Sequence, residues 1–180
     1  MGKSEQDHDI RLRPAMLADV PALQVLEQRC FSSDKLSVRS FRRFITEKRS
    51  DLIALEVDEA LAGYFLLIYR RGTSLARLYS IAVDPAFRQK GLAEKLMAEA
   101  EVQAANRHCA LLRLEVRKDN EAAIKLYKKL QYHEFAIKHD FYEDHADAIC
   151  MQKQVIQFKR DSVTRQVPYI AQTTPFTCGP

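Results

Sequence analysis

The sequence of 180 residues contains little cysteine, and its cysteines are far apart: Cys30, Cys109, Cys150 and Cys178. Disulfide frameworks belong to short secreted chains, and a metal site needs clustered ligands. No CxxC pair occurs, and no histidine stands at zinc-ligand spacing from a cysteine. We therefore expect reduced thiols and no metal.

Long hydrophobic runs are also missing. The longest apolar run, 64–69, is far too short to cross a bilayer. The first nine residues are polar and acidic, so they lack the basic and then apolar pattern of a signal peptide. We expect no membrane partner and a cytoplasmic protein.

The charge balance is only mildly basic. Lys and Arg number 28 against 24 Asp and Glu, a net charge of +4. This excess is too small to indicate a nucleic-acid partner, but it suits a phosphate-rich small ligand. Hydrophobic residues make up 47% and charged residues 29%, which excludes disordered, collagen-like and coiled-coil chains. We expect a disordered start at 1–9, one domain at 10–153, and a linker with a further segment at 154–180.

Local patterns predict alternating strands and helices. Apolar runs and turn residues predict strands at 10–13, 52–57, 61–69, 75–83, 110–116, 133–138 and 148–153. Helical spacing of apolar residues predicts helices at 18–30, 38–48, 91–107 and 120–130. This order predicts an α/β fold with a central mixed sheet and helices on both faces.

The stretch from 81 to 94 carries most of the chemical information. A buried strand runs into a loop with the cations Arg88 and Lys90, and Gly91 then opens a long helix. The first amides of a helix lack helical partners and the helix dipole is positive there, so this turn can hold a phosphate or pyrophosphate. A solvated basic loop with a glycine easing the turn is the alternative. GxGxxG and GKS/T motifs are absent from the sequence.

Residues 88–93, Arg-Gln-Lys-Gly-Leu-Ala, resemble the Q/R-x-x-G-x-G/A motif of the GNAT superfamily of N-acetyltransferases, which binds the pyrophosphate of acetyl-CoA. The preceding strand and the following amphipathic helix match this context. The resemblance covers roughly 10–153 and implies the GNAT acyl-CoA N-acyltransferase fold, with acetyl-CoA as co-substrate. Ala93 stands for the last glycine of the motif, a substitution that the superfamily tolerates.

A narrower resemblance is to the bacterial ribosomal-protein-alanine N-acetyltransferase branch, which acetylates a protein N-terminus. It is carried by four segments: 114–117 (Leu-Glu-Val-Arg), 120–127 (Asn-Glu-Ala-Ala-Ile-Lys-Leu-Tyr), 141–143 (Phe-Tyr-Glu) and 147–149 (Asp-Ala-Ile). In that branch the strand Glu is the general base and the helix Tyr the general acid, which implies these roles for Glu115 and Tyr127. The segment 132–134, Tyr-His-Glu, departs from the Gly-Phe common after this helix and changes a turn rather than the chemistry.

The same resemblance implies contacts to acetyl-CoA from a strand, a loop and two helix starts. The residues are Ile81, Ala82, Val83, Arg88, Gln89, Lys90, Gly91, Leu92, Ala93, Glu94 and Asn120. The acceptor groove is expected between the loops 31–38 and 139–146, with Tyr142 as a lining residue.

Each of these residues also has a purely structural interpretation. Glu115 could be an exposed strand carboxylate, and Tyr127 could only pack in its helix. Asn120 fits a helix cap, a role compatible with a ligand contact. Tyr142 could be a solvent-exposed loop tyrosine.

The predicted function is transfer of an acetyl group from acetyl-CoA to a primary amine, most simply a protein or peptide α-amine. Releasing the proton of an α-amine at pH 7 requires about 1.4 kcal/mol, against about 4.6 kcal/mol for lysine, so one carboxylate is an adequate base. Cys109 and Cys150 have no flanking pattern that lowers a thiol pKa, so direct attack in a ternary complex is favoured over an acetyl-cysteine. The alternatives are lysine or small-molecule acceptors, or a non-catalytic CoA-binding module.

The end of the chain has a different character. Gln172, Cys178 and Gly179 resemble the opening of papain-like cysteine peptidases of the bacteriocin-leader-processing type. The downstream His and Asp that would activate the thiol have no counterpart, so we expect no peptidase activity. The segment is either the start of a second domain in a longer acetyltransferase–peptidase polypeptide or a tail that resembles one by chance.

Overall fold

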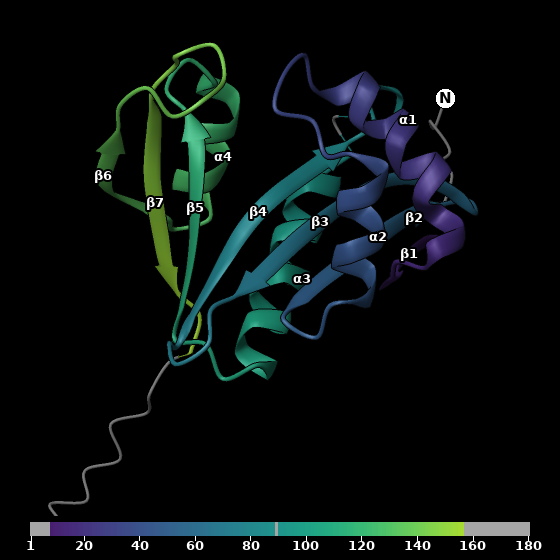
Figure 1. The fold of residues 1–180 in the computed structure, drawn as a ribbon, viewed down its shortest axis with the longest axis horizontal. Coiled ribbons are helices and arrows are strands. Elements are labelled where there is room, and N and C mark those ends of the chain that lie inside the picture. Colours follow the sequence, from purple (N-terminus) through teal and green to yellow (C-terminus); the bar gives the residue numbers. More distant parts are fainter. Residues whose placement is uncertain (1–7, 89, 157–180) are drawn as a thin grey trace, which may run out of the picture.

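A computed structural model describes residues 8–88 and 90–156 of the chain (Figure 1). In these residues the chain forms a seven-stranded sheet. The strands are β1 (Ile10–Pro14), β2 (Ser50–Val57), β3 (Ala60–Tyr69), β4 (Leu75–Val83), β5 (Leu111–Arg117), β6 (His133–Lys138) and β7 (Ala148–Gln154). All seven predicted strands are present, and β4 and β6 have the predicted bounds.

Four α-helices and two 3₁₀ turns occur in the same residues. They are η1 (Leu17–Asp19), α1 (Val20–Cys30), α2 (Val38–Thr46), η2 (Pro85–Phe87), α3 (Leu92–Asn106) and α4 (Glu121–Lys129). The predicted helices are confirmed, but each is shorter than expected. Pro21 lies in the first turn of α1, where its missing N–H would have no partner in the helix, and Leu17–Asp19 form a separate 3₁₀ turn before α1. Gly91 is the N-cap of α3 rather than its first helical residue.

The strands pair in the order β1-β2-β3-β4-β5-β7-β6. The β4–β5 pair is parallel, and the other neighbours in this sheet are antiparallel. The mixed sheet and the α/β class are therefore as predicted.

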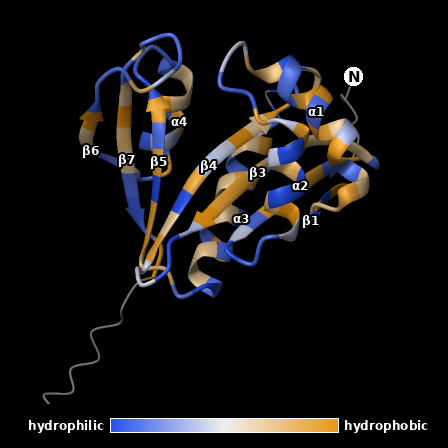
Figure 2. Ribbon diagram, viewed as in Figure 1, coloured by the Kyte–Doolittle hydropathy of each residue, from blue (hydrophilic) through white to orange (hydrophobic). Residues whose placement is uncertain are grey.

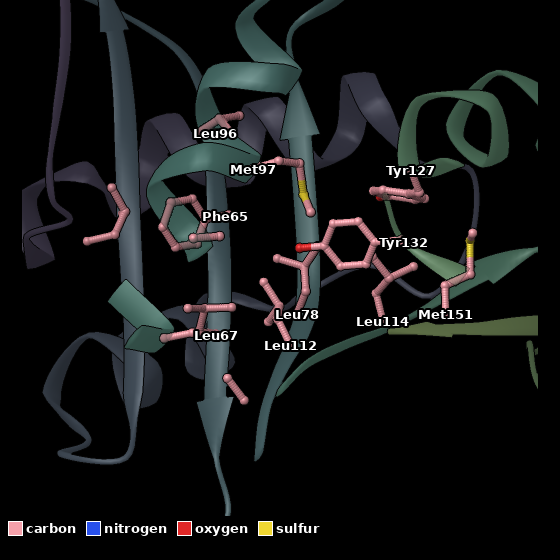
Figure 3. Packing of buried hydrophobic residues seen from close by; sticks show 14 of the residues in the cluster. Phe65, Leu67, Leu78, Leu96, Met97, Leu112, Leu114, Tyr127, Tyr132 and Met151 are labelled. Atoms are coloured by element: carbon pink, nitrogen blue, oxygen red, sulfur yellow. The ribbon is translucent and has the colours of Figure 1, made fainter. Parts of the chain in front are cut away.

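Apolar side chains cover both faces of the sheet because successive residues of β3 point in opposite directions. Tyr64 and Leu66 pack in a cluster with α1 and α2, whereas Phe65 and Leu67 pack in a second cluster with α3. Figure 3 shows part of the second cluster, with Met97 of α3 close to the strands. Apolar residues are prominent on the inner strands, and the loop between β6 and β7 is hydrophilic (Figure 2). The prediction of helices on both faces is confirmed.

The sheet opens between β4 and β5. In the described part of the chain these strands pair from Leu75–Leu78 to Leu111–Leu114, and beyond that point they diverge (Figure 1). Tyr79 is the extra residue of a β-bulge, since Leu67 pairs with Leu78 but Leu66 pairs with Ser80. A bulge bends its strand and strengthens the local twist, so β4 turns away from β5 where this bulge occurs.

Within residues 8–88 and 90–156, no helix combines the length and the apolar character that a membrane crossing requires.

Candidate active site

A cavity of about 510 Å³ lies where β4 and β5 separate. Its walls come from the end of α1 and the loop after it, from β4 and β5, from the start of α4, and from the β6–β7 loop. The lining residues are Cys30, Phe31, Ser32, Ser33, Asp34, Arg77, Leu78, Tyr79, Ser80, Ile81, Leu114, Glu115, Val116, Arg117, Asn120, Ala123, Tyr127, Phe141 and Tyr142.

Glu115 lies on β5 with a side chain that is 12% exposed. Its Oε2 accepts a hydrogen bond of 2.9 Å from Nε of Arg77 on β4, and its Oε1 accepts one of 2.6 Å from Nζ of Lys138 on β6. Two cations from neighbouring strands therefore hold the carboxylate at the cavity wall. Charge-assisted bonds of this length fix orientation as well as charge.

Tyr127 lies on α4 on the opposite face of the sheet. It is 6% exposed and packs in the cluster that contains Leu114 and Val116, whose side chains alternate with Glu115 along β5. Figure 3 shows its ring beside Tyr132 and Leu114. Because β4 and β5 diverge, side chains from both faces of the sheet reach one cavity.

The hydroxyl of Tyr127 is available for a ligand. No hydrogen bond to this hydroxyl is present in the described part of the chain, and Tyr127 is one of the residues that line the cavity. Burial raises the pKa of Tyr127, followed by a smaller effect of Tyr142. The phenol is therefore protonated at neutral pH and can donate its proton into the cavity.

Tyr142 is half-buried at the cavity edge. Burial, and then the charge of Glu115, raise the pKa of Tyr142 to about 12. The guanidinium of Arg117 lies 4.9 Å from the Tyr142 ring centroid and binds both carboxylate oxygens of Asp144, at 3.0 and 2.8 Å. These contacts hold the β6–β7 loop against the end of β5.

The two predicted acceptor loops meet across the cavity. The backbone N–H of Glu143 donates a hydrogen bond of 3.3 Å to Oδ1 of Asp34. The first loop contributes Phe31 and the second contributes Phe141 to the lining. The cavity is therefore partly closed at the end where an acceptor is expected.

The N-terminus of α3 has the backbone geometry of an anion site. Gly91 has φ +69°, a left-handed conformation, and the first helical bond runs from the Lys95 N–H to the Gly91 carbonyl at 3.1 Å. The amides of residues 92–94 therefore have no acceptor within the helix. Together with the helix dipole they favour a phosphate at this point.

The side chains around this turn divide into three groups. Arg88 and Lys90 are exposed, as a phosphate contact requires. Leu92 is 2% exposed in the core, so only its backbone is offered to a ligand. Glu94 is paired with Lys129 at 2.6 Å, and this cation offsets part of its negative charge. Gln89 lies outside the described residues.

Comparison with known proteins identifies the family. Residues 20–132 match the family model described as acetyltransferase (GNAT) family. The chain belongs to the GNAT family of acetyltransferases. Members of this family use acetyl-CoA.

Individual relatives agree with this assignment. The [ribosomal protein bS18]-alanine N-acetyltransferase of Salmonella typhimurium is 34% identical over 136 residues, which is 74% of this chain and 89% of that protein. The crystal structure of the ribosomal-protein-S18-alanine N-acetyltransferase from Escherichia coli superposes with a TM-score of 0.76 at 28% identity, covering 85% of this chain and 98% of that one. The N-terminal acetyltransferase complex ARD1 subunit homolog of Dictyostelium discoideum is 28% identical over 145 residues, 79% of this chain and 71% of that protein.

The GNAT cavity gathers only some of the predicted site residues. Those that line it are Ile81, Glu115, Asn120, Tyr127 and Tyr142. Outside its lining, along the end of β4 and the start of α3, lie Ala82, Val83, Arg88, Lys90, Gly91, Leu92, Ala93 and Glu94. The predicted residues thus lie partly at the cavity and partly beyond its lining, along the end of β4 and the start of α3.

Asn120 caps α4 at the wall of the cavity. Its Oδ1 accepts a hydrogen bond of 3.1 Å from the Ala123 N–H as the N-cap of α4. Ala123 also lines the cavity, so the cap lies at its wall. The structure therefore contains the cap interaction and leaves the ligand contact as a prediction.

Sequence analysis did not identify Arg77 and Lys138 at this GNAT site. The sequence places Arg77 on the strand predicted at 75–83, but it does not indicate that Arg77 contacts Glu115. Lys138 reaches Glu115 across β7, which lies between β5 and β6. Only knowledge of the strand order could have placed these two charges together.

The predicted peptidase-like tail falls on residues 157–180, outside the described residues. The family match ends at residue 132 and gives the tail prediction no support.

Proposed function

We propose that this chain transfers the acetyl group of acetyl-CoA to the α-amine of a protein or peptide N-terminus by direct attack in a ternary complex. The observation that carries the proposal is the cavity at the β4–β5 split, where Glu115 and Tyr127 reach one space from opposite faces of the sheet. The relatives whose names specify alanine or N-terminal acetylation support this acceptor. The activity is proposed for the domain predicted at 10–153, whose last strand, β7, continues to Gln154.

The residues present suit acetyl-CoA as co-substrate. The free amides at the start of α3, with Arg88 and Lys90, would hold the pyrophosphate. The free edge of β4 at Ile81–Val83 would pair with the pantetheine, since β5 has diverged from it. Acetyl-CoA supplies an activated thioester. Asn120, at the cavity wall, would contact the pantetheine arm.

Glu115 is proposed as the general base. Its carboxylate would take a proton from the acceptor ammonium, directly or through a water molecule, and the neutral amine would attack the thioester. An α-amine of pKa about 8 is deprotonated at pH 7 for about 1.4 kcal/mol, and a lysine of pKa about 10.4 needs about 4.6 kcal/mol. The carboxylate of Glu115, held by Arg77 and Lys138, is therefore proposed to deprotonate an α-amine rather than a lysine side chain.

Cysteine chemistry is not favoured. Among the described cysteines, Cys109 and Cys150 are buried, and Cys30 lines the cavity half-buried. Burial is the largest effect on all three and raises the pKa of each thiol. A thiol kept protonated is a poor nucleophile, so the amine attacks the thioester directly.

Tyr127 is proposed as the general acid for the departing thiolate. Changing Tyr127 to Phe keeps the ring in the core and removes the hydroxyl, the group that could donate a proton. We expect kcat to fall by about 10- to 1,000-fold with little change in KM, because the lost interaction forms mainly in the transition state. Steady-state kinetics would measure this. The control is Tyr69→Phe, because Tyr69 is half-buried, does not line the cavity, and donates its hydroxyl proton to Oδ2 of Asp51 at 2.6 Å. Wild-type kcat in the Tyr127 variant would remove this role.

The acceptor is tested directly. Purified protein is mixed with acetyl-CoA and three kinds of amine: peptides with free N-termini, N-blocked peptides with one lysine, and small amines. We expect thiol release with the free N-termini, alanine among them, and little with the other two. Release with lysine or small amines alone would replace the proposed acceptor. Acetyl-CoA binding without release under every acceptor would indicate a non-catalytic module.

A further inference from the structure

Glu27 is a buried carboxyl group that the proposed mechanism does not use. It lies on α1 and is 1% exposed. Its Oε2 accepts a hydrogen bond of 2.7 Å from the backbone N–H of Leu36, and its Oε1 accepts one from the hydroxyl of Tyr64 on β3. Both oxygens of the group are therefore paired with donors from other parts of the fold.

The network continues to the cavity wall. Tyr64 is fully buried, and its hydroxyl oxygen lies 2.7 Å from Oγ of Ser80 on β4. Ser80 is half-buried and lines the cavity, one residue after the bulge at Tyr79. A carboxyl group on α1 is thus connected through one phenol to a hydroxyl that a bound substrate can touch.

The direction of each hydrogen bond among Glu27, Tyr64 and Ser80 follows from which groups can donate and which can accept. The hydroxyl of Tyr64 donates to Oε1 of Glu27, so its single proton points to Glu27. The Tyr64 oxygen then accepts, and the proton of Ser80 points to Tyr64. The lone pairs of Ser80 are left for the cavity. Burial is the largest effect and raises the pKa of Glu27, and the bonds from Tyr64 and Leu36 act in the opposite direction.

We infer that Glu27 is a positioning residue that acts through Tyr64 and holds the Ser80 hydroxyl as a hydrogen-bond acceptor toward the cavity. Ser80 then selects an N–H donor. This inference rests on the proposed function, in which two ligands carry such groups: the amides of the pantetheine arm and the amine or first amides of the acceptor peptide. Glu27 also holds the loop between α1 and α2 at Leu36, next to the cavity-lining residues 31–34.

Ser80 is tested first, by binding rather than by turnover. Wild type and Ser80→Ala are titrated calorimetrically with acetyl-CoA alone, and then with an alanine-initiated peptide on the CoA-loaded protein. We expect the Kd of one ligand to rise about 3- to 10-fold, the effect of one lost hydrogen bond. Weakening of acetyl-CoA would assign the N–H to the pantetheine, and weakening of the peptide would assign it to the acceptor. Unchanged Kd values for both ligands would overturn the inference, whether or not the enzyme turns over.

Glu27→Gln tests the direction of the network. The amide oxygen must face the Leu36 N–H, so the amide NH₂ donates to the Tyr64 oxygen. This reverses the donor and acceptor roles along the network. Ser80 would then point its proton into the cavity, while the loop anchor at Leu36 is retained. We expect Glu27→Gln to weaken the same ligand as Ser80→Ala does, and by about the same 3- to 10-fold factor.

The double variant separates this role from a structural one. In the Ser80→Ala background, Glu27→Gln should change the Kd by less than about twofold, because the group it acts through is gone. If the Kd of the double variant equals the product of the two single fold-changes, the role of Glu27 is overturned. Glu47→Gln, an exposed carboxyl at the end of α2, is the matched control. If Glu27→Gln does not fold, Tyr64→Phe interrupts the same network and must weaken the same ligand as Ser80→Ala for the inference to stand.

Discussion

Replacing Glu115 with Gln is expected to lower kcat by about 10²- to 10⁴-fold while the Kd for acetyl-CoA changes by less than about twofold. The amide keeps the shape of the side chain but cannot take a proton from the amine. Its position between Arg77 and Lys138 places it beside the β4–β5 opening, not at the proposed pyrophosphate site on α3. Turnover and binding should therefore separate.

The pH dependence sharpens this expectation. As pH rises toward the α-amine pKa of about 8, a growing share of the acceptor is already neutral, so turnover depends less on proton removal by Glu115. The deficit of Glu115→Gln should thus shrink by about fivefold at most between pH 7 and pH 8, because the neutral fraction of the amine rises from about 9% to about 50%. Glu56→Gln is the control, since Glu56 is a strand carboxylate paired with Arg13 and does not line the cavity. Equal losses of kcat and of acetyl-CoA affinity in Glu115→Gln would contradict the base role.

Replacing Gly91 with Val is expected to weaken acetyl-CoA binding by at least about 100-fold. Gly91 has φ +69°, and a β-branched residue held there is strained by about 1–3 kcal/mol. The valine would move to negative φ and turn the amides of residues 92–94 away from the phosphate. Gly91→Asn, which tolerates this conformation, should retain affinity within about tenfold. Calorimetric titration with acetyl-CoA measures both.

Gly72 provides a matched control in the same chain. It has φ +75° between β3 and β4, and a Cβ at either glycine meets no described atom within 4 Å. Gly72→Val therefore introduces the same backbone strain without touching the proposed pyrophosphate site. Both variants should lose stability in thermal unfolding, but only Gly91→Val should lose acetyl-CoA. Wild-type affinity in Gly91→Val, or an equal loss in Gly72→Val, would remove the phosphate assignment.

The hairpin of β2 and β3 illustrates how much local chemistry predicts. Asp58 and Glu59 lie between the strands predicted at 52–57 and 61–69, and they form the turn with φ of 50° and 66°. Positive φ at both positions matches the twist of the flanking strands. Turn residues and alternation act over a few neighbouring residues, so they are readable in one sequence.

The order of strands in the sheet, unlike the turns, cannot be predicted from neighbouring residues. β7, and not β6, pairs with β5, and this places Lys138 across β7 from Glu115. Alternation says which residues share a face, but not which strands are neighbours. The pairing of Glu115 with two cations was therefore outside the reach of the sequence. The same holds for the contact of Glu27 with Tyr64, which joins α1 to β3.

The sequence by itself determined the helices and strands, the mixed sheet, and the glycine at the start of α3, because these depend on periodicity, capping and backbone freedom within short segments. The tertiary structure decided where β4 leaves β5. That depends on the bulge at Tyr79 and on the register between strands distant in the chain. Because the sheet opens there, Glu115 and Tyr127, which lie on opposite faces, reach a single cavity.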